Sequence, residues 1–357
     1  MSILTRYVAA ALLRGWFITF LVVAAVFGLL AFIDELDAAH GDYGAAAVAS
    51  YTLMVLPQQL LGLAPVILLL GTIIGLAGLQ KGSELTVISC AGVPVSRLLL
   101  AIAVPTAAVT LLLWVGMETV TAPLHQRAEA LRLKVRYDNP HTLPAGGVWS
   151  KSGRRYIHLG TMRDERVPAD IALYAFDARG RLERAIHAAT ATVGDDRRWQ
   201  FEDVQEKVLE QGQLTTRRHD SLAVDNLWAR RELPVLSLSP ESMRLPVLYS
   251  YGTYLAANAR DARSYLSTFW QRLTLPLTAA AMVFLATPVS AQLGSRRGNA
   301  VGMNLAVGAL IGIGFYLGSQ IVFALGTLIG LPPLLVALLP AFVIAACAAL
   351  LLRRMHW

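Results

Sequence analysis

The sequence contains few charged residues and only two cysteines. Charged side chains make up 15% of its 357 residues, whereas a soluble globular protein usually carries about 25%. With 55% hydrophobic residues, this composition excludes a disordered chain, a collagen-like chain and an ordinary soluble enzyme. The cysteines, Cys90 and Cys347, are too few and too isolated to form a disulfide scaffold or a metal site.

The shortage of charge is uneven along the chain. Residues 124–265 contain 22 Lys and Arg and 18 Asp and Glu, so 28% of that segment is charged. The other 215 residues hold only 15 charged side chains. The first composition is that of a water-soluble domain, and the second is that of a membrane-embedded protein. The formal net charge of +7 fits a membrane protein with basic cytoplasmic loops, so we expect no nucleic-acid partner.

Long uncharged runs predict six transmembrane helices. Each helix needs about 20 residues to cross the membrane. The run at 298–352 is too long for one helix, and Pro332 and Pro333 divide it. The expected helices are 12–33, 53–79, 98–122, 268–290, 300–325 and 334–352.

The distribution of Lys and Arg predicts the orientation of these helices. The short loops 34–50 and 326–333 contain no basic residue. The opposite flanks contain Arg6, Arg14, Lys81, Arg97, Arg296, Arg297, Arg353 and Arg354. By the positive-inside rule we expect both termini in the cytoplasm and 124–265 outside it. We expect no cleaved signal peptide, because the first apolar run exceeds a signal h-region.

The charged segment has the pattern of a β domain. Turn signals separate short runs of β-branched and aromatic residues, which favours a sandwich, barrel or jelly roll. The predicted strands lie at 147–150, 155–159, 171–176 and 199–201. The expected organisation is helices one to three in 1–123, the β domain in 124–265, and helices four to six in 266–357.

Catalytic motifs are missing from the sequence. It contains no P-loop, no H-E-x-x-H zinc motif and no G-x-S-x-G nucleophile motif. Its seven histidines are scattered, with none at metal-ligand spacing. We therefore expect no catalytic residue, metal or cofactor in this chain, and ATP-driven work would need a separate ATPase. Asp34, Glu35 and Glu118 lie near membrane ends, where they are functional candidates or simply mark helix ends in water.

The loop between the second and third helices predicts a short cytoplasmic helix near 83–92. Ser83 can cap it, Glu84 favours its first turn, and Gly92 and Pro94 can end it. Such a helix is what a permease offers to an ATPase, although an ordinary capped loop helix has the same pattern.

This loop resembles a known family. The segment 83–87, with 91–93 after it, resembles the coupling segment of the LptF/LptG permeases of the lipopolysaccharide exporter. Segments 32–36, 269–272 and 330–340 resemble the end of the first helix, the start of the fourth and the last hairpin of that family. The resemblance covers nearly the whole chain.

The resemblance implies an α-helical membrane protein with six transmembrane helices, three on each side of an inserted periplasmic β-jelly-roll domain. It implies a non-catalytic permease subunit of an ATP-driven transporter in the inner membrane of a Gram-negative bacterium. The transporter would extract lipopolysaccharide and pass it to a periplasmic bridge toward the outer membrane. Expected partners are an LptF-like permease, an LptB-like ATPase dimer that binds ATP and Mg, and an LptC-like single-span protein.

The resemblance also implies site residues. Ser83, Glu84 and Leu85 are expected to couple the chain to the ATPase. A lipid cavity needs an apolar interior and cationic groups at its rim, because the cargo carries acyl chains and phosphates. The expected substrate contacts are Asp34, Arg127, Arg132, Lys134, Arg136, Phe315 and Tyr316.

Two departures from the family pattern affect the phosphate contacts. Ala31 and Gln58 stand where the family often has lysine. Phosphate contacts then come from the partner or from the arginines after the third helix, which could equally form a solvated basic face. Two other function classes stay open at this point: an intramembrane lipid-modifying enzyme, which needs a reactive pair at membrane depth, and a secondary lipid transporter.

Overall fold

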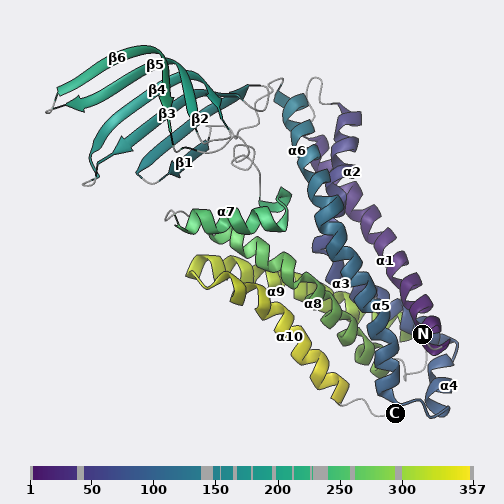
Figure 1. Cartoon of the computed structure of the whole chain (residues 1–357). Coiled ribbons are helices and arrows are strands. Elements are labelled where there is room, and N and C mark those ends of the chain that lie inside the picture. The colour runs from purple at the N-terminus through teal and green to yellow at the C-terminus, as the bar shows by residue number, and fades with distance from the viewer. Residues whose placement is uncertain are drawn as a thin grey trace. The chain divides into compact units, whose positions relative to one another are not determined.

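The computed structural model contains six helices that are long and apolar enough to span a membrane, counted among the residues it describes (Figure 1). These residues are 3–37, 44–137, 148–152, 154–163, 167–177, 180–194, 198–210, 213–225, 227, 240–257, 262–293 and 300–353. Two compact units make up the chain. We call them the membrane unit, residues 1–38, 52–125 and 263–357, and the β unit, residues 39–51 and 126–262.

The spans confirm the predicted number of transmembrane helices. The second span differs from the prediction, because 53–79 is not one helix: it is divided between α2 and α3 at Leu63. Pro65 lies in the first turn of α3, where its missing N–H breaks no helical hydrogen bond. The helices are α1 (Ile3–Leu36), α2 (Ala45–Gly62), α3 (Ala64–Lys81), α5 (Val95–Gly116), α8 (Arg263–Leu293), α9 (Ala300–Ile329) and α10 (Pro333–Arg353).

The third span continues beyond its predicted end at residue 122. A π-helical segment, Met117–Thr121, joins α5 to α6 (Ala122–Tyr137). Such single-turn widenings often occur inside α-helices at functional sites. The polypeptide therefore leaves the membrane unit as a continuous helix rather than through a loop.

Helices α3 and α8 form the centre of the membrane unit. They are the two most buried spans, whereas α1 and α9 expose most of their length. Leu68 and Leu76 of α3 pack in one cluster with Leu12 of α1 and Val283 of α8. Leu69 and other residues of α3 pack in a second cluster with α8, α9 and α10. The exposed apolar faces of α1 and α9 are consequently available to lipid or to another protein.

Glycines allow α1 and α3 to touch backbone to backbone. A Cβ atom on Gly15 would lie 2.1 Å from the carbonyl oxygen of Gly71, and one on Gly75 would lie 2.8 Å from the oxygen of Ala11. Small residues at such contacts let helices in a membrane approach closely. Beside this contact, Trp16 Nε1 donates a 2.9 Å hydrogen bond to Thr72 Oγ1, and both side chains are buried.

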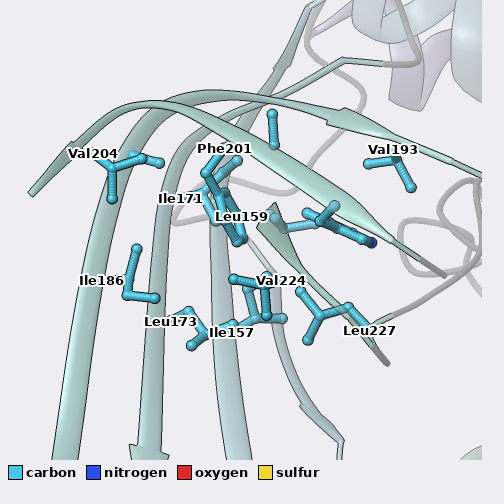
Figure 2. Packing of buried hydrophobic residues seen from close by; sticks show 13 residues of the cluster. Ile157, Leu159, Ile171, Leu173, Ile186, Val193, Phe201, Val204, Val224 and Leu227 are labelled. Carbon is cyan, nitrogen blue, oxygen red and sulfur yellow. The ribbon is translucent and has the colours of Figure 1, made fainter. Parts of the chain in front are cut away.

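The β unit contains one antiparallel sheet of six described strands, hydrogen-bonded in chain order. The jelly-roll-like β domain predicted between the two groups of helices is thereby confirmed. Buried side chains gather under the curved strands (Figure 2), with Trp199 and Phe201 among the largest. Tyr251 of α7 (Leu245–Ala257) packs against this cluster. The strands are β1 (Val148–Ser152), β2 (Arg155–Arg163), β3 (Val167–Phe176), β4 (Leu182–Val193), β5 (Trp199–Glu210) and β6 (Gln213–Val224).

Strand β5 changes the phase of its buried residues halfway along. Trp199 and Phe201 are buried, and after Asp203 the buried positions are Val204 and Glu206. Asp203 has a φ of +51°, in the left-handed region that non-glycine residues rarely adopt. This irregularity places the carboxylate of Glu206 on the same buried face as the apolar core.

Candidate functional site

The short helix predicted between the second and third spans is present as α4 (Glu84–Cys90). Val87 N–H donates to the carbonyl of Ser83 at 3.1 Å and closes its first turn. A residue that caps a helix through its side chain is normally extended. Ser83 has a φ of +57°, so its backbone does not have the conformation expected of the predicted cap. Gly92, with a φ of +74°, follows the helix in the conformation that commonly ends one.

Glu84 lies where α4 meets the start of α1. The hydroxyl of Tyr7 donates a 2.8 Å hydrogen bond to Glu84 Oε2. Leu85 is partly buried against the cluster that includes Val8 and Leu12 of α1. Val87, one turn after Glu84, is 65% exposed. The helix is thus fastened to the membrane unit on one side and presents an uncovered apolar side chain on another.

The C-terminal end of α1 carries two carboxylates in different surroundings. Asp34, the predicted substrate contact, is exposed, whereas its neighbour Glu35 is buried. A carboxylate rarely stays buried without a partner, and Glu35 does engage other groups. A cavity role was predicted from the sequence for Asp34, the exposed carboxylate, and not for its buried neighbour Glu35.

The predicted basic residues after the third span differ in their environments. Arg127 is exposed. Arg132 lies over the ring of Tyr51, with its guanidinium carbon 5.2 Å from the ring centroid, and Tyr51 also donates a long 3.4 Å hydrogen bond to Glu129. Cation–π geometry of this kind fixes the arginine in place. The side chains of Lys134 and Arg136 lie outside the described part of the structure.

The two predicted acyl-chain contacts on α9 point in different directions. Phe315 is partly buried against the cluster formed with α3, α8 and α10. Tyr316 is exposed, as are Ile313 and Leu317 on the same helix. Of the pair, Tyr316 is therefore the side chain that is free to meet a lipid, and Phe315 holds α9 against its neighbours.

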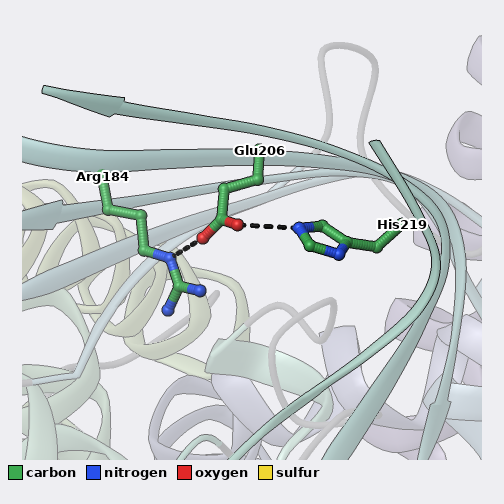
Figure 3. A network of polar contacts seen from close by, with 3 residues as sticks. All are labelled: Arg184, Glu206 and His219. Atoms are coloured by element: carbon green, nitrogen blue, oxygen red, sulfur yellow. Dashed lines mark hydrogen bonds and ion pairs between the residues drawn. The ribbon is translucent and has the colours of Figure 1, made fainter. Parts of the chain in front are cut away.

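A buried ion-pair network lies on the core face of the sheet, and sequence reasoning did not find it. Glu206 of β5 is almost fully buried and accepts hydrogen bonds from two neighbouring strands (Figure 3). Arg184 of β4 donates from Nε to Oε1, and His219 of β6 lies with Nε2 at 2.9 Å from Oε2. The network therefore ties β4, β5 and β6 together. Its sequence signal is alternation, because Glu206 stands in phase with Val204 and Val208.

The environment of Glu206 has opposing effects on its pKa. Burial alone would raise the pKa of this carboxyl, but hydrogen bonds from Arg184 and His219 and their charges together lower it below its ordinary value of 4.5. The carboxylate is therefore ionised in the folded protein at neutral pH. A buried charge of this kind is stable only while its partners stay in place.

No group of three or more His, Cys, Asp or Glu among the described residues has an arrangement suited to a metal ion. Some polar side chains join helices or strands to one another, and others donate to a carbonyl one turn back in their own helix. What the arrangement offers is a surface-accessible short helix, exposed apolar helix faces and a β domain whose core face is mainly apolar.

Comparison with known proteins agrees with this architecture. The family model described as "Lipopolysaccharide export system permease LptF/LptG" matches residues 6–354. The chain is 28% identical over 348 residues to the lipopolysaccharide export system permease protein LptG of Escherichia coli K12, covering 95% of each chain. It is 26% identical over 355 residues to LptG of Haemophilus influenzae, covering 98% of each chain. Both relatives carry the name LptG. The chain is thus a multi-pass protein of the inner membrane, and it belongs to the LptF/LptG family of lipopolysaccharide export permeases.

Proposed function

We propose that this chain is the permease subunit of an ATP-driven exporter that extracts lipopolysaccharide from the inner membrane and passes it to a periplasmic bridge. The observation that carries the proposal is α4, a short helix between two spans whose first residue is an acidic side chain fastened to α1. Family membership supports lipopolysaccharide as the substrate, and this helix supports coupling to an ATPase as the source of energy.

The coupling helix offers two features to an ATPase. Glu84 is an acceptor for a basic side chain, and a charge-assisted hydrogen bond of that kind is stronger than a neutral one. Val87, three residues later on an adjacent part of the helix face, supplies exposed apolar surface. We propose an LptB-like ATPase dimer as the partner, with ATP and Mg bound by that subunit and no cofactor in this chain.

The lipid path follows from the exposed faces of the membrane unit. Helices α1 and α9 are the least buried spans, so an LptF-like permease facing them would complete a lipid cavity, with Tyr316 on its wall. An LptC-like single-span protein would bind beside the first span. Arg127, Arg132, Lys134 and Arg136 would serve the headgroup, because phosphates are bound by cationic side chains at an apolar rim. Asp34 would line the cavity mouth beside them.

The β unit supplies the next stage of the path. Its core face is lined by apolar side chains such as Ile171, Leu173 and Phe201, which suit acyl chains. We place this domain in the periplasm and both termini in the cytoplasm, because the basic residues of the short loops lie on one side of the six spans.

The test is mild-detergent purification of the tagged chain, with mass spectrometry of the recovered proteins and lipids. The proposal predicts a second six-span permease, an ATPase and bound lipid A. A Glu84→Arg variant, purified in parallel, should retain the permease and the lipid but lose the ATPase. Failure to recover an ATPase both in the purified sample and after crosslinking in cells would overturn the proposal.

A further inference from the structure

The start of α1 supports the coupling helix through side chains that are distant in sequence. Tyr7 and Glu84 are 77 residues apart, and the 2.8 Å hydrogen bond between them joins α1 to the first turn of α4. Next to it, Leu85 packs in the cluster of Val8 and Leu12. The hydrogen bond therefore ties the first turn of α4 to α1, and Leu85 packs against a cluster to which α1 contributes.

The hydrogen bond restricts only part of the carboxylate. An ionised carboxylate has two oxygens and about four acceptor positions, and Tyr7 uses one position on Oε2. Oε1 lies toward Gly82, where a Cβ atom would be only 3.0 Å from it. Glycine at 82 thus leaves room on the Oε1 side, while Tyr7 holds the other oxygen.

We propose that Tyr7 is a positioning residue for Glu84: its hydroxyl orients the carboxylate so that the second oxygen is presented to a basic side chain of the ATPase. The inference rests on the proposed coupling role of Glu84 and adds a residue to it. A flexible glutamate without this bond would sample several rotamers, and only some of them would meet the partner.

The expected size of the effect is modest. Tyr7 is 49% exposed, so water competes for the carboxylate and the hydrogen bond makes a limited net contribution. Removing the hydroxyl in Tyr7→Phe should raise the ATPase-subunit concentration needed for half-maximal lipopolysaccharide release by about five-fold. The maximal rate at saturating ATPase should stay unchanged, because the variant weakens docking and leaves the lipid path intact.

The deciding experiment is a double-mutant cycle with Tyr7→Phe, Glu84→Ala and the combined variant, in the full chain reconstituted with its partners. Alanine removes the acceptor of the Tyr7 hydroxyl, so if Tyr7 acts through Glu84, Tyr7→Phe adds nothing in the Glu84→Ala background. Gly82→Ala, which leaves the hydroxyl in place but crowds Oε1, should shift half-saturation in the same direction. Tyr249→Phe is the matched control, since Tyr249 of the β unit is 48% exposed.

Two results would overturn the inference and leave the proposed function standing. One is an unchanged half-saturation in Tyr7→Phe while Glu84→Ala is impaired. The other is a Tyr7→Phe effect of equal size in the wild-type and Glu84→Ala backgrounds, which would mean a general effect on α1. Normal release by Glu84→Ala itself would instead remove the coupling role, and the inference would fall with it.

Discussion

The ion-pair network of the β unit makes a quantitative prediction about Glu206→Gln. This change keeps the size of the side chain and removes its charge. Glu206 accepts one charge-assisted hydrogen bond from each neighbouring strand, and each such bond contributes about 1.5–3 kcal/mol in mutational series. The glutamine oxygen can still accept one of them. Since Arg184 and His219 are 38% and 35% exposed, water replaces part of the loss.

We therefore expect Glu206→Gln to lower the free energy of local opening of β4–β6 by about 2 kcal/mol, an increase of about thirty-fold in the opening constant. The assay is hydrogen exchange with mass spectrometry on the full chain in detergent, comparing peptides from the two units. Exchange should accelerate in β4, β5 and β6 and stay unchanged in α3 and α8.

Glu202→Gln provides the matched control on the same strand. Glu202 is exposed and accepts a 3.0 Å hydrogen bond from Thr190, and an exposed interaction of this kind contributes about 0–1 kcal/mol. Equal exchange rates for wild type and Glu206→Gln would refute the reasoning, because the network would then add nothing to the stability of the sheet.

The same network predicts the direction of a pH effect. The pKa of Glu206 is lowered in the folded state, so its stabilisation is complete above the ordinary value and is lost as the pH falls through the lowered one. The difference between wild type and Glu206→Gln should be full at neutral pH and shrink as the pH falls through the lowered pKa of Glu206. A difference that is constant over this range would show that the charge of Glu206 is not the cause.

Two further substitutions test the packing of the units. Gly15→Ala should destabilise the membrane unit by about 1–3 kcal/mol, because its Cβ would lie 2.1 Å from the Gly71 oxygen. Thermal aggregation in detergent measures this loss, and unchanged stability would contradict the close contact between α1 and α3. Phe201→Ala should destabilise the β unit by about 3–5 kcal/mol, because this ring is fully buried. The expected result is faster proteolysis of the β unit alone, and unchanged proteolysis would contradict a core role for Phe201.

The membrane architecture was predictable because charge is excluded from hydrocarbon. The uncharged runs therefore predicted the six spans, and the basic loops predicted an orientation for them. The break at Leu63 was not predictable in the same way, since α2 and α3 are apolar on both sides of it. The predicted third helix ended at residue 122, so the π-helical link that continues it into α6 was not predicted.

The β domain was predictable where strands are apolar. β2 and β3 contain compact hydrophobic runs, whereas β6 has an unbroken polar run from Thr215 to Ser221; neither β6 nor β4 was predicted. The pairing of Glu206 with Arg184 and His219 depends on the register of three strands. The contact between Tyr7 and Glu84 depends on how α1 packs beside α4, so neither follows from local sequence.

Coupling of lipid release to ATP through α4 is the central claim, and one measurement tests it most directly. Lipopolysaccharide release from proteoliposomes that contain the chain and its partners is compared for wild type, Glu84→Arg and Ser96→Arg. Ser96 is exposed in the first turn of α5, so that variant adds the same charge without altering Glu84. The account predicts ATP-dependent release by wild type and Ser96→Arg, and release reduced to the ATP-free level by Glu84→Arg. ATP-dependent release at the wild-type rate by Glu84→Arg would contradict it.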